Sequence, residues 1–283
     1  MAVNSMAVGE LYCRLVPLVL LLVDGSSPID VTDPRWEIYL AIESKSNDHG
    51  VVGIKLLGFA AVNRFYDNIG NSHLRISQIL VLPPYQGRGH GRLLLEVINS
   101  VAVSENVYDV TVEKASDYFQ HVRTCFDMHR LLDFEPIKHD ISSAALHLKQ
   151  GNSSKKPFKG QFDPPLTAVE DVRRSLKINK KQFLQCWEIL LFLELIHSDF
   201  ENYRTLITDG RRDDMLGKDT ALNDFDHEMT TVAVCLRDNV NVDNINAEVE
   251  ENQDTQEEQL KQLVGNRMKE IMEIAKKILL NHQ

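Results

Sequence analysis

The sequence predicts an α+β fold, in which a mixed sheet flanked by helices precedes a small all-helical C-terminal domain. Two observations indicate the sheet. Apolar and β-branched residues form several strand-like runs before residue 114, and a glycine-rich turn separates one of these runs from a helix. A third observation indicates the helical domain, because beyond residue 165 the apolar residues recur only at helical spacing. This order of elements is typical of an α+β protein.

The first strand is expected at Leu15–Val23, where Pro17 and β-branched valines suit a buried strand that starts at the proline. The run also has features of a signal peptide, with Arg14 before it, but it is too short to span a bilayer. The other expected elements are strands at Trp36–Glu43, Ile54–Phe65, Leu74–Leu82 and Tyr108–Glu113, and helices at Arg92–Ser104 and Phe119–Leu132.

A polar segment, Lys149–Pro165, is the clearest predicted linker, because its composition and its prolines interrupt regular structure. Beyond it, helices are expected at Thr167–Leu176, Lys180–His197 and Glu257–Asn281, packed as a small bundle rather than as a coiled coil. The predicted domains are therefore a frayed start at residues 1–14, the sheet domain at 15–148, the linker at 149–165 and the helical domain at 166–283.

The most informative feature is the glycine loop Gln86–Gly91, which lies between a predicted strand and a predicted helix. Glycines let a backbone approach a ligand closely, and a helix N-terminus offers N–H groups and partial positive charge to a phosphate. The loop has neither the Lys-Ser/Thr of a P-loop nor the spacing of a dinucleotide-binding fold. A glycine-rich hairpin turn is the structural alternative, but the strand and helix around the loop favour a pyrophosphate-bearing cofactor.

The composition of the 283 residues limits the classes of partner. A formal net charge of −10 argues against nucleic-acid binding as the main role and fits a basic partner better. The four cysteines are too far apart for a Cys-x-x-Cys metal site, so we expect reduced thiols in a cytosolic or nuclear protein. The ten histidines show no His-x-x-x-His spacing, and we expect no metal.

The spacing Gln86-x-x-Gly89-x-Gly91 resembles the acetyl-coenzyme A loop of the GNAT superfamily of N-acetyltransferases. The stretch Ser77–Gly91, together with Asp109-Val-Thr-Val-Glu113 and the residues from Pro28 to Trp36, is similar to the catalytic subunit of the type B histone acetyltransferases. The similarity runs from about Leu15 to the C-terminus. It is strongest over residues 24–123 and thin over residues 200–245.

The resemblance implies a histone lysine N-acetyltransferase that uses acetyl-coenzyme A and no metal. It implies direct attack of the lysine amine on the thioester in a ternary complex, without a covalent enzyme intermediate. The implied substrate is the N-terminal tail of free, newly synthesised histone H4, and the implied partner is a WD-repeat histone chaperone in the cytoplasm and nucleus. Neither direct nucleic-acid binding nor a membrane role is expected.

Two carboxylates are the candidate catalytic residues. A free lysine has a pKa near ~10.4, so the enzyme must provide a base or a path for the proton to one. Glu113 ends a predicted strand and matches the residue to which the family assigns this role, although many strands end in an exposed glutamate. Asp24 matches a family glutamate near the incoming lysine, and an ordinary Asp-Gly turn explains it equally well.

By the same resemblance, the backbone of three strand residues provides contacts to the coenzyme and to the oxyanion that forms on the thioester. Arg88, His90 and Arg92 add charge-assisted contacts to phosphates, although exposed charges near a helix start are common. The candidate coenzyme-binding residues are Ile79, Leu80, Val81, Gln86, Gly87, Arg88, Gly89, His90, Gly91, Arg92 and Ser116.

For the substrate, Trp36 matches an aromatic residue of the family's lysine channel, and a core tryptophan is the alternative. Asn63, Arg64 and Phe65 match positions that contact the histone tail. The sequence departs from the family at Lys114, where an acid is common. A lysine there would repel a cationic substrate or lower the pKa of the neighbouring base.

The family also carries an N-terminal domain that forms part of the histone-tail groove, and we expect it to be absent from this chain because Met1 lies shortly before Leu15. Two rival functions remain. One is acetyl transfer to a small-molecule amine. The other is a catalytically impaired module that binds acetyl-coenzyme A or a chaperone without turnover.

Overall fold

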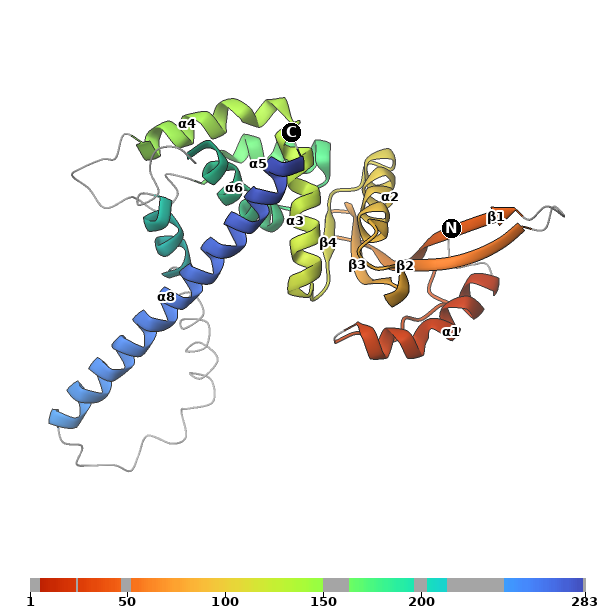
Figure 1. Ribbon diagram of the computed structural model, residues 1–283, viewed down its shortest axis with the longest axis horizontal. Coiled ribbons are helices and arrows are strands. Elements are labelled where there is room, and N and C mark those ends of the chain that lie inside the picture. Colours follow the sequence, from red (N-terminus) through yellow and green to blue (C-terminus); the bar gives the residue numbers. More distant parts are fainter. Residues whose placement is uncertain are drawn as a thin grey trace. The chain divides into compact units, whose positions relative to one another are not determined.

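The computed structural model describes residues 6–23, 25–46, 52–149, 163–195, 203–212 and 242–281. Its elements are shown in Figure 1. Packing divides the chain into two compact units. The first comprises Met1–Asp140 with Pro164–Trp187, and the second comprises Ile141–Asp163 with Glu188–Gln283.

The first unit is built on a four-stranded mixed sheet with the order β1-β2-β3-β4. The strands are β1 (Trp36–Ser46), β2 (Val52–Tyr66), β3 (Ser72–Val81) and β4 (Val110–Val112). The first three strands pair antiparallel along the chain, and β4 pairs parallel to β3. The predicted α+β fold with a mixed sheet is therefore confirmed.

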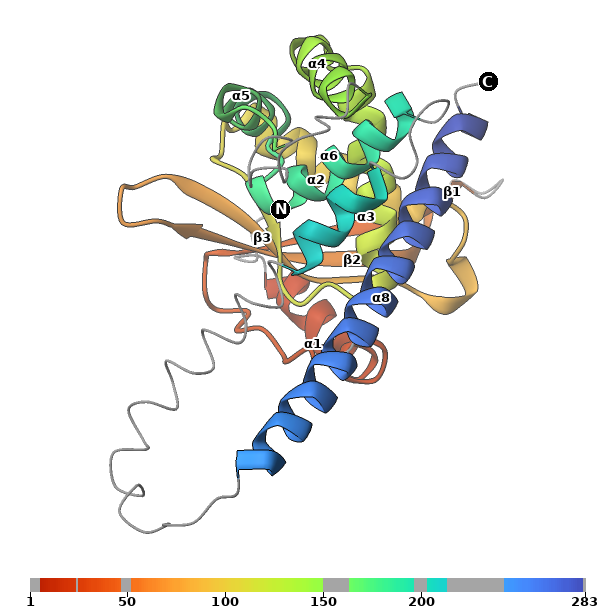
Figure 2. The same ribbon diagram turned by 90° about the vertical axis from the view of Figure 1, so that its left-hand side faces the viewer.

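Helices cover both faces of this sheet. Helix α1 (Met6–Leu22) lies on one face, and α2 (His90–Ser104) and α3 (Asp117–Leu132) lie on the other, as Figure 2 shows. The core on the α2 face joins Ala60, Val62, Leu74, Ile76, Leu95, Ile98, Ala102, Val107, Val110 and Phe126. The core on the α1 face joins Tyr12, Leu15, Val19, Ile38, Phe59 and Leu80. Burial of these apolar side chains is the main source of the unit's stability.

The strand expected at Leu15–Val23 is wrong, because these residues form the last turns of helix α1 and the segment that follows it. The buried side chains of the helix are Tyr12, Leu15 and Val19, which recur at helical spacing. A short apolar run fits a buried strand and a helix equally well, and the proline that favoured a strand lies inside the helix at position 17. The period of the buried residues, rather than the apolar composition, decides between the two.

The remaining helices were largely expected. They are α4 (Lys138–Lys149), α5 (Leu166–Leu176), α6 (Lys180–Leu195), a helix over residues 203–212, and α8 (Val242–Asn281). Two short 3-10 helices occupy Pro83–Tyr85 and Glu135–Ile137. The sequence predicted neither α4 nor the helix over residues 203–212, and α8 begins before the expected Glu257. Most of the expected linker, residues 150–162, lies outside the described residues. The predicted domain boundaries stay a prediction.

The second unit is held by an apolar stripe on α8 and by one polar centre. Along α8, Leu260, Val264, Met268, Ile271, Ile274, Ala275 and Ile278 are buried. Glu188 forms ion pairs with Arg267 at 2.6 Å and with Arg211 at 3.4 Å, and its carbonyl oxygen accepts a hydrogen bond from the hydroxyl of Tyr203. Among the described helices, none combines the length and apolar character needed to cross a membrane.

Candidate functional site

A β-bulge in β3 marks the centre of the candidate site. Ile76 pairs with Val62 and Gln78 pairs with Ala61, so Ser77 is an extra residue on β3. Before the bulge, Ile76 points into the core on the α2 face. After it, Ile79 contacts that core, whereas Leu80 belongs to the core on the α1 face. The bulge therefore shifts the phase of the strand by one residue, as an extra residue must.

The bulge also changes which peptide groups of β3 face away from β2. The N–H of Leu82 donates to Leu57 O on β2, so alternation along the strand directs the backbone groups of Ile79 and Val81 to the other edge. In the described part of the chain, β4 pairs with β3 only from Leu74 to Ile76. Beyond that point, this edge of β3 offers hydrogen-bonding groups that a strand-like ligand can use.

The glycine loop follows β3 and opens directly into α2. Gly87 and Gly89 have φ values of 73° and 84°, and Gly89 is the N-cap of the helix. A Cβ at either glycine would meet nothing within 4 Å, so the space in front of the loop is open. The side-chain amide of Gln86 donates to Val81 O at 2.9 Å and closes the loop onto the strand.

The N-terminus of α2 has the properties of an anion site. The first N–H groups of a helix have no intrahelical acceptor, and the helix dipole adds partial positive charge. The first turn contains no acidic residue, and Arg88, His90 and Arg92 lie around it. Arg92 is already paired with Glu96, with its Nε 2.9 Å from the carboxylate. The loop, the helix end and the open β3 edge together fit the pyrophosphate and the amide-containing arm of a coenzyme A.

Glu113 follows β4 at the point where β4 leaves β3. Its N–H donates to Ile76 O at 2.9 Å, which places it beside the bulge. Val110 and Val112 pack in the core on the α2 face, so alternation directs Thr111 and Glu113 to the α1 face. The Glu113 side chain is exposed, so a carboxylate there is accessible to an incoming amine.

Two other charged residues, Lys114 and Asp24, were expected near Glu113. Lys114 is exposed and adopts a left-handed conformation with φ of 45°, and its side chain approaches Gly25. The Glu113–Lys114 turn therefore lies near the segment that follows α1. Asp24, the second candidate carboxylate, lies outside the described residues.

Three of the expected substrate residues share the face of Glu113. Trp36 packs against the core on the α1 face, and it pairs across the sheet with Asn63. Asn63 pairs with Arg75, and Arg75 pairs with Thr111, so one row of side chains crosses all four strands. Phe65 lies next to this row, with the Arg75 guanidinium 4.4 Å from its ring centre.

Arg64 does not join this row, because it points to the opposite face. Its guanidinium binds Glu37 at 2.6 Å and Glu105, at the end of α2, at 2.5 Å. Burial opposes the charge, but the bonds to these two carboxylates outweigh it and raise the pKa of Arg64. In this structure Arg64 ties β1 and β2 to α2.

Ser116 caps helix α3, where its hydroxyl oxygen accepts a hydrogen bond from Phe119 N at 3.3 Å. That bond leaves a second lone pair and the hydroxyl proton for another partner. The expected coenzyme contact of Ser116 stays a prediction.

Sequence reasoning missed two features of the site. The first is Arg75, whose place in the row depends on strand register. The second is the anchor of α1, in which the Tyr12 hydroxyl donates to Gln78 Oε1 at 3.0 Å and accepts from Ile29 N at 3.1 Å. The sequence also contained a signal for the bulge. Between Ile76 and Ile79, the apolar residues that face the α2 side change from even-numbered to odd-numbered positions.

Comparison with known proteins agrees with this geometry. The model of the acetyltransferase (GNAT) family matches residues 25–123, which include β1 to β4, the glycine loop and Glu113. A solved aminoglycoside acetyltransferase from an uncultured soil metagenomic sample covers 47% of this chain and 84% of its own, at 16% identity. Its TM-score is 0.33.

Curated relatives extend the similarity beyond the family match. The histone acetyltransferase type B catalytic subunit of Arabidopsis thaliana is 49% identical over 98% of this chain and 62% of its own length. The subunit of the same name from Zea mays is 45% identical over 96% of this chain and 61% of its own. The chain thus spans about three fifths of the length of these relatives. Residues 25–123 thus match the acetyltransferase (GNAT) family, and over nearly its whole length the chain is similar to type B histone acetyltransferase catalytic subunits.

Proposed function

We propose that this chain transfers acetyl from acetyl-coenzyme A to a lysine in the N-terminal tail of free histone H4. The observation that carries the proposal is the combination of an open β3 edge with a glycine loop at the N-terminus of α2. The names of the curated relatives support a histone as substrate. The net charge of −10 agrees with a basic tail.

Each part of the site has a role in this reaction. The loop and the first turn of α2 would hold the pyrophosphate, and the outer edge of β3 at Ile79 and Val81 would hold the arm of the coenzyme beside the bond from Gln86 to Val81 O. Acetyl-coenzyme A supplies the acetyl group as a thioester. A backbone N–H on this edge would stabilise the oxyanion that develops on the thioester carbonyl.

Glu113 is the proposed general base. It lies beside the bulge and its side chain is exposed, so it can accept the proton of the lysine ammonium directly or through one water molecule. The neutral amine then forms the new C–N bond, the C–S bond breaks, and the coenzyme leaves as its thiol or thiolate. The row from Trp36 to Thr111 lies on the same face and offers a surface for the residues that flank the lysine.

The test measures transfer of labelled acetyl from acetyl-coenzyme A to an H4 tail peptide. We expect the parent chain to be active and Glu113→Gln to lose at least a hundredfold in kcat, on the order expected for a general base. Glu135→Gln removes the same charge at an exposed glutamate paired with Lys138, and it is the matched control. Equal activity of parent and Glu113→Gln would exclude Glu113 as the base.

Two further measurements separate the rival functions. Transfer to polyamines in preference to the peptide would favour a small-molecule acetyltransferase. Calorimetric binding of the coenzyme without any transfer would favour a binding module, for which Lys114 is the supporting observation. The WD-repeat chaperone stays a prediction, and co-purification with a recombinant chaperone of that class tests it.

A further inference from the structure

The outer edge of β4 is covered by a segment that lies far along the chain. Ile178 forms a parallel bridge with Val110, and the N–H of Val110 donates to Lys177 O at 2.9 Å. The carbonyl oxygen of Val110 accepts two bonds, from Asn179 Nδ2 at 3.0 Å and from Arg123 Nη2 at 2.9 Å. We call residues 173–179 the β4 strap.

The strap is also fixed to the segment that precedes β4 and to α3. The Arg173 guanidinium donates to Tyr108 O at 3.1 Å and lies 3.6 Å from the centre of the Tyr108 ring. The Lys177 ammonium donates to Asn106 Oδ1 at 2.7 Å. Arg130 also donates to the carbonyl oxygen of Leu176. These bonds leave β4 little freedom to move relative to α3 and α5.

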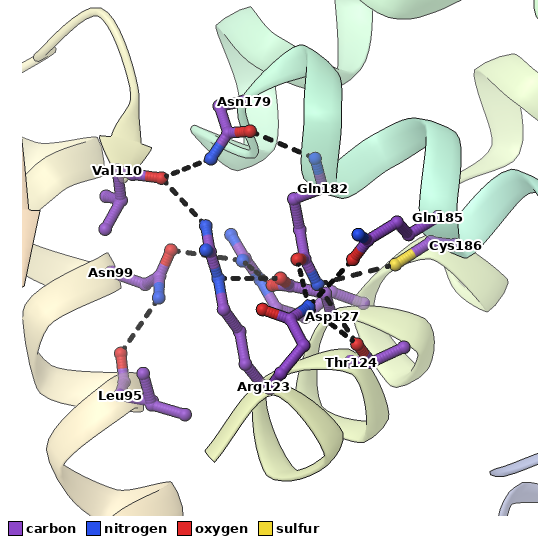
Figure 3. A network of polar contacts seen from close by, with 12 residues as sticks. Leu95, Asn99, Val110, Arg123, Thr124, Asp127, Asn179, Gln182, Gln185 and Cys186 are labelled. Carbon is purple, nitrogen blue, oxygen red and sulfur yellow. Dashed lines mark hydrogen bonds and ion pairs between the residues drawn. The ribbon is translucent and has the colours of Figure 1, made fainter. Parts of the chain in front are cut away.

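A buried polar network supports the strap from α3, and Figure 3 shows it. Asp127 lies 3.7 Å from Arg123 and 3.0 Å from Arg130, and Arg130 also donates to Asn99 on α2. Burial raises the pKa of Asp127 and lowers that of Arg123. Charged groups in such surroundings depend on their partners, so the network has few alternative arrangements.

We infer that the β4 strap is a positioning element for Glu113 and for the gap between β3 and β4. β4 comprises only Val110–Val112, and its pairing with β3 ends at Ile76. Val110, which the strap holds, lies three residues before Glu113. A shift of Val110 would therefore move Glu113 and change the width of the gap. The inference rests on the proposed function for its catalytic part and on geometry alone for its structural part.

Asn179 allows the strap to be tested without removing a helix cap. Its Oδ1 accepts from Gln182 N at 3.0 Å, which caps α6, whereas its Nδ2 binds Val110 O. Serine is a good N-cap but is too short to keep the second bond, so Asn179→Ser removes the clamp on β4 and keeps the cap. Asn179→Asp keeps the cap and replaces the donor. Gln185→Ser, which removes a bond to Gln120 on α3, is the control on the same helix.

The first readout is steady-state transfer to the H4 peptide. We expect kcat of Asn179→Ser and Asn179→Asp to fall on the order of tenfold to a hundredfold, since small displacements of reacting groups have effects of this size. The Kd of the coenzyme, which binds at β3 and α2 in the proposed function, should change less than about twofold. Gln185→Ser should leave kcat within about twofold of the parent. A loss of kcat in this control equal to that of Asn179→Ser would contradict a specific role of the clamp.

The second readout is amide hydrogen exchange, which requires no activity. Glu113 N–H should exchange at least about tenfold faster in Asn179→Ser, while Val62 N–H in β2 should keep the rate of the parent. An unchanged exchange rate at Glu113 N–H would contradict the inference that the strap holds β4 in place. Faster exchange with unchanged kcat would overturn its role in positioning the base. If the parent transfers no acetyl, the proposed function fails, and the exchange at Glu113 alone decides whether the strap holds β4.

Discussion

The N–H of Glu113 donates to the carbonyl oxygen of Ile76 over 2.9 Å, immediately before the bulged residue of β3. This bond joins the candidate base to the point where β3 changes phase and its outer edge becomes free. One local irregularity thus sets both the outer edge proposed for the coenzyme and the place of the proposed base. Bulges are common next to active sites because they re-aim side chains in this way.

The glycine at the N-cap of α2 provides the first prediction. Gly89→Ala places a Cβ at a φ of 84°, where an L-residue is strained by about 1–2 kcal/mol. The strain should rotate the first N–H groups of α2, and we expect the coenzyme Kd to rise by roughly tenfold, which equals about 1.4 kcal/mol. Isothermal titration calorimetry measures the change.

Gly70→Ala is the matched control for this variant. Gly70 lies in the turn between β2 and β3 with a φ of 91°, and a Cβ there also meets nothing within 4 Å. Both variants should therefore lose similar stability, but Gly70→Ala should keep the parent's affinity. An equal loss of affinity in both variants would mean that general destabilisation, rather than the loop, explains the effect.

The charge beside the candidate base provides the second prediction. Lys114→Asp restores the acid that is common in the family and suits a left-handed position better than most residues. We expect the KM for the basic peptide to fall severalfold at low salt, with a smaller change in kcat, because the repulsion becomes an attraction. The difference should shrink at about 0.5 M salt, where exposed charges are screened.

A change of the same charge at a distant site separates local from global electrostatics. Lys276→Asp, on the exposed side of α8, alters the net charge equally. It should leave the peptide KM close to that of the parent. If both variants lower KM to the same extent, the net charge rather than Lys114 controls the encounter with the peptide.

The turn between β2 and β3 provides a prediction on pH dependence. The bond from the Asn71 side chain, with backbone bonds and His73, lowers the pKa of Asp67 to about 2. A carboxyl group whose pKa is lowered by folding stabilises the fold at pH values above its pKa in the unfolded chain, which is about 3.9. This stabilisation is lost as the pH falls through the pKa of about 2 in the folded protein. Asp67→Asn should therefore be less stable than the parent at pH 7, with a difference that narrows between about pH 4 and pH 2.

Urea denaturation across this pH range measures the effect, and Asn71→Ala provides the independent check. It removes the bond that lowers the pKa most, so it should reduce the same pH-dependent difference while leaving the carboxylate in place. A parallel offset at all pH values in both variants would contradict the assignment to Asp67.

The sequence contained enough information for the strands β1 to β4 and for the glycine loop before α2, because these are local patterns. Strand alternation and the glycine spacing are each visible within a short stretch of sequence. The row from Trp36 to Thr111 was only partly predictable, since Arg75 joins it through strand register. The contact of Val110 with Ile178 was not predictable from one sequence, because it depends on tertiary packing between distant segments.

The N-terminal helix α1 was also not predictable from its local sequence. Leu15–Val23 was expected to be a strand because its composition fits one, and no local signal excluded it. The structure makes it helical because Tyr12, Leu15 and Val19 then form one buried face against the sheet. Tertiary burial overrides a weak local preference in such cases.

The anchor of this helix provides the last prediction. Tyr12→Phe removes the hydroxyl that bonds to both Gln78 and Ile29 N. The ring remains in the core, where it contacts Phe59 edge to face at 6.3 Å, so little packing is lost. The buried Gln78 Oε1 would lose its partner, and we expect a loss of about 1–3 kcal/mol in the free energy of unfolding.

Tyr66→Phe is the control, because it removes a hydroxyl from a 63% exposed residue on β2 and should reduce the free energy of unfolding far less. Equal denaturation midpoints for the two variants would contradict the packing of α1 on β3, and with it the helix in place of the expected strand.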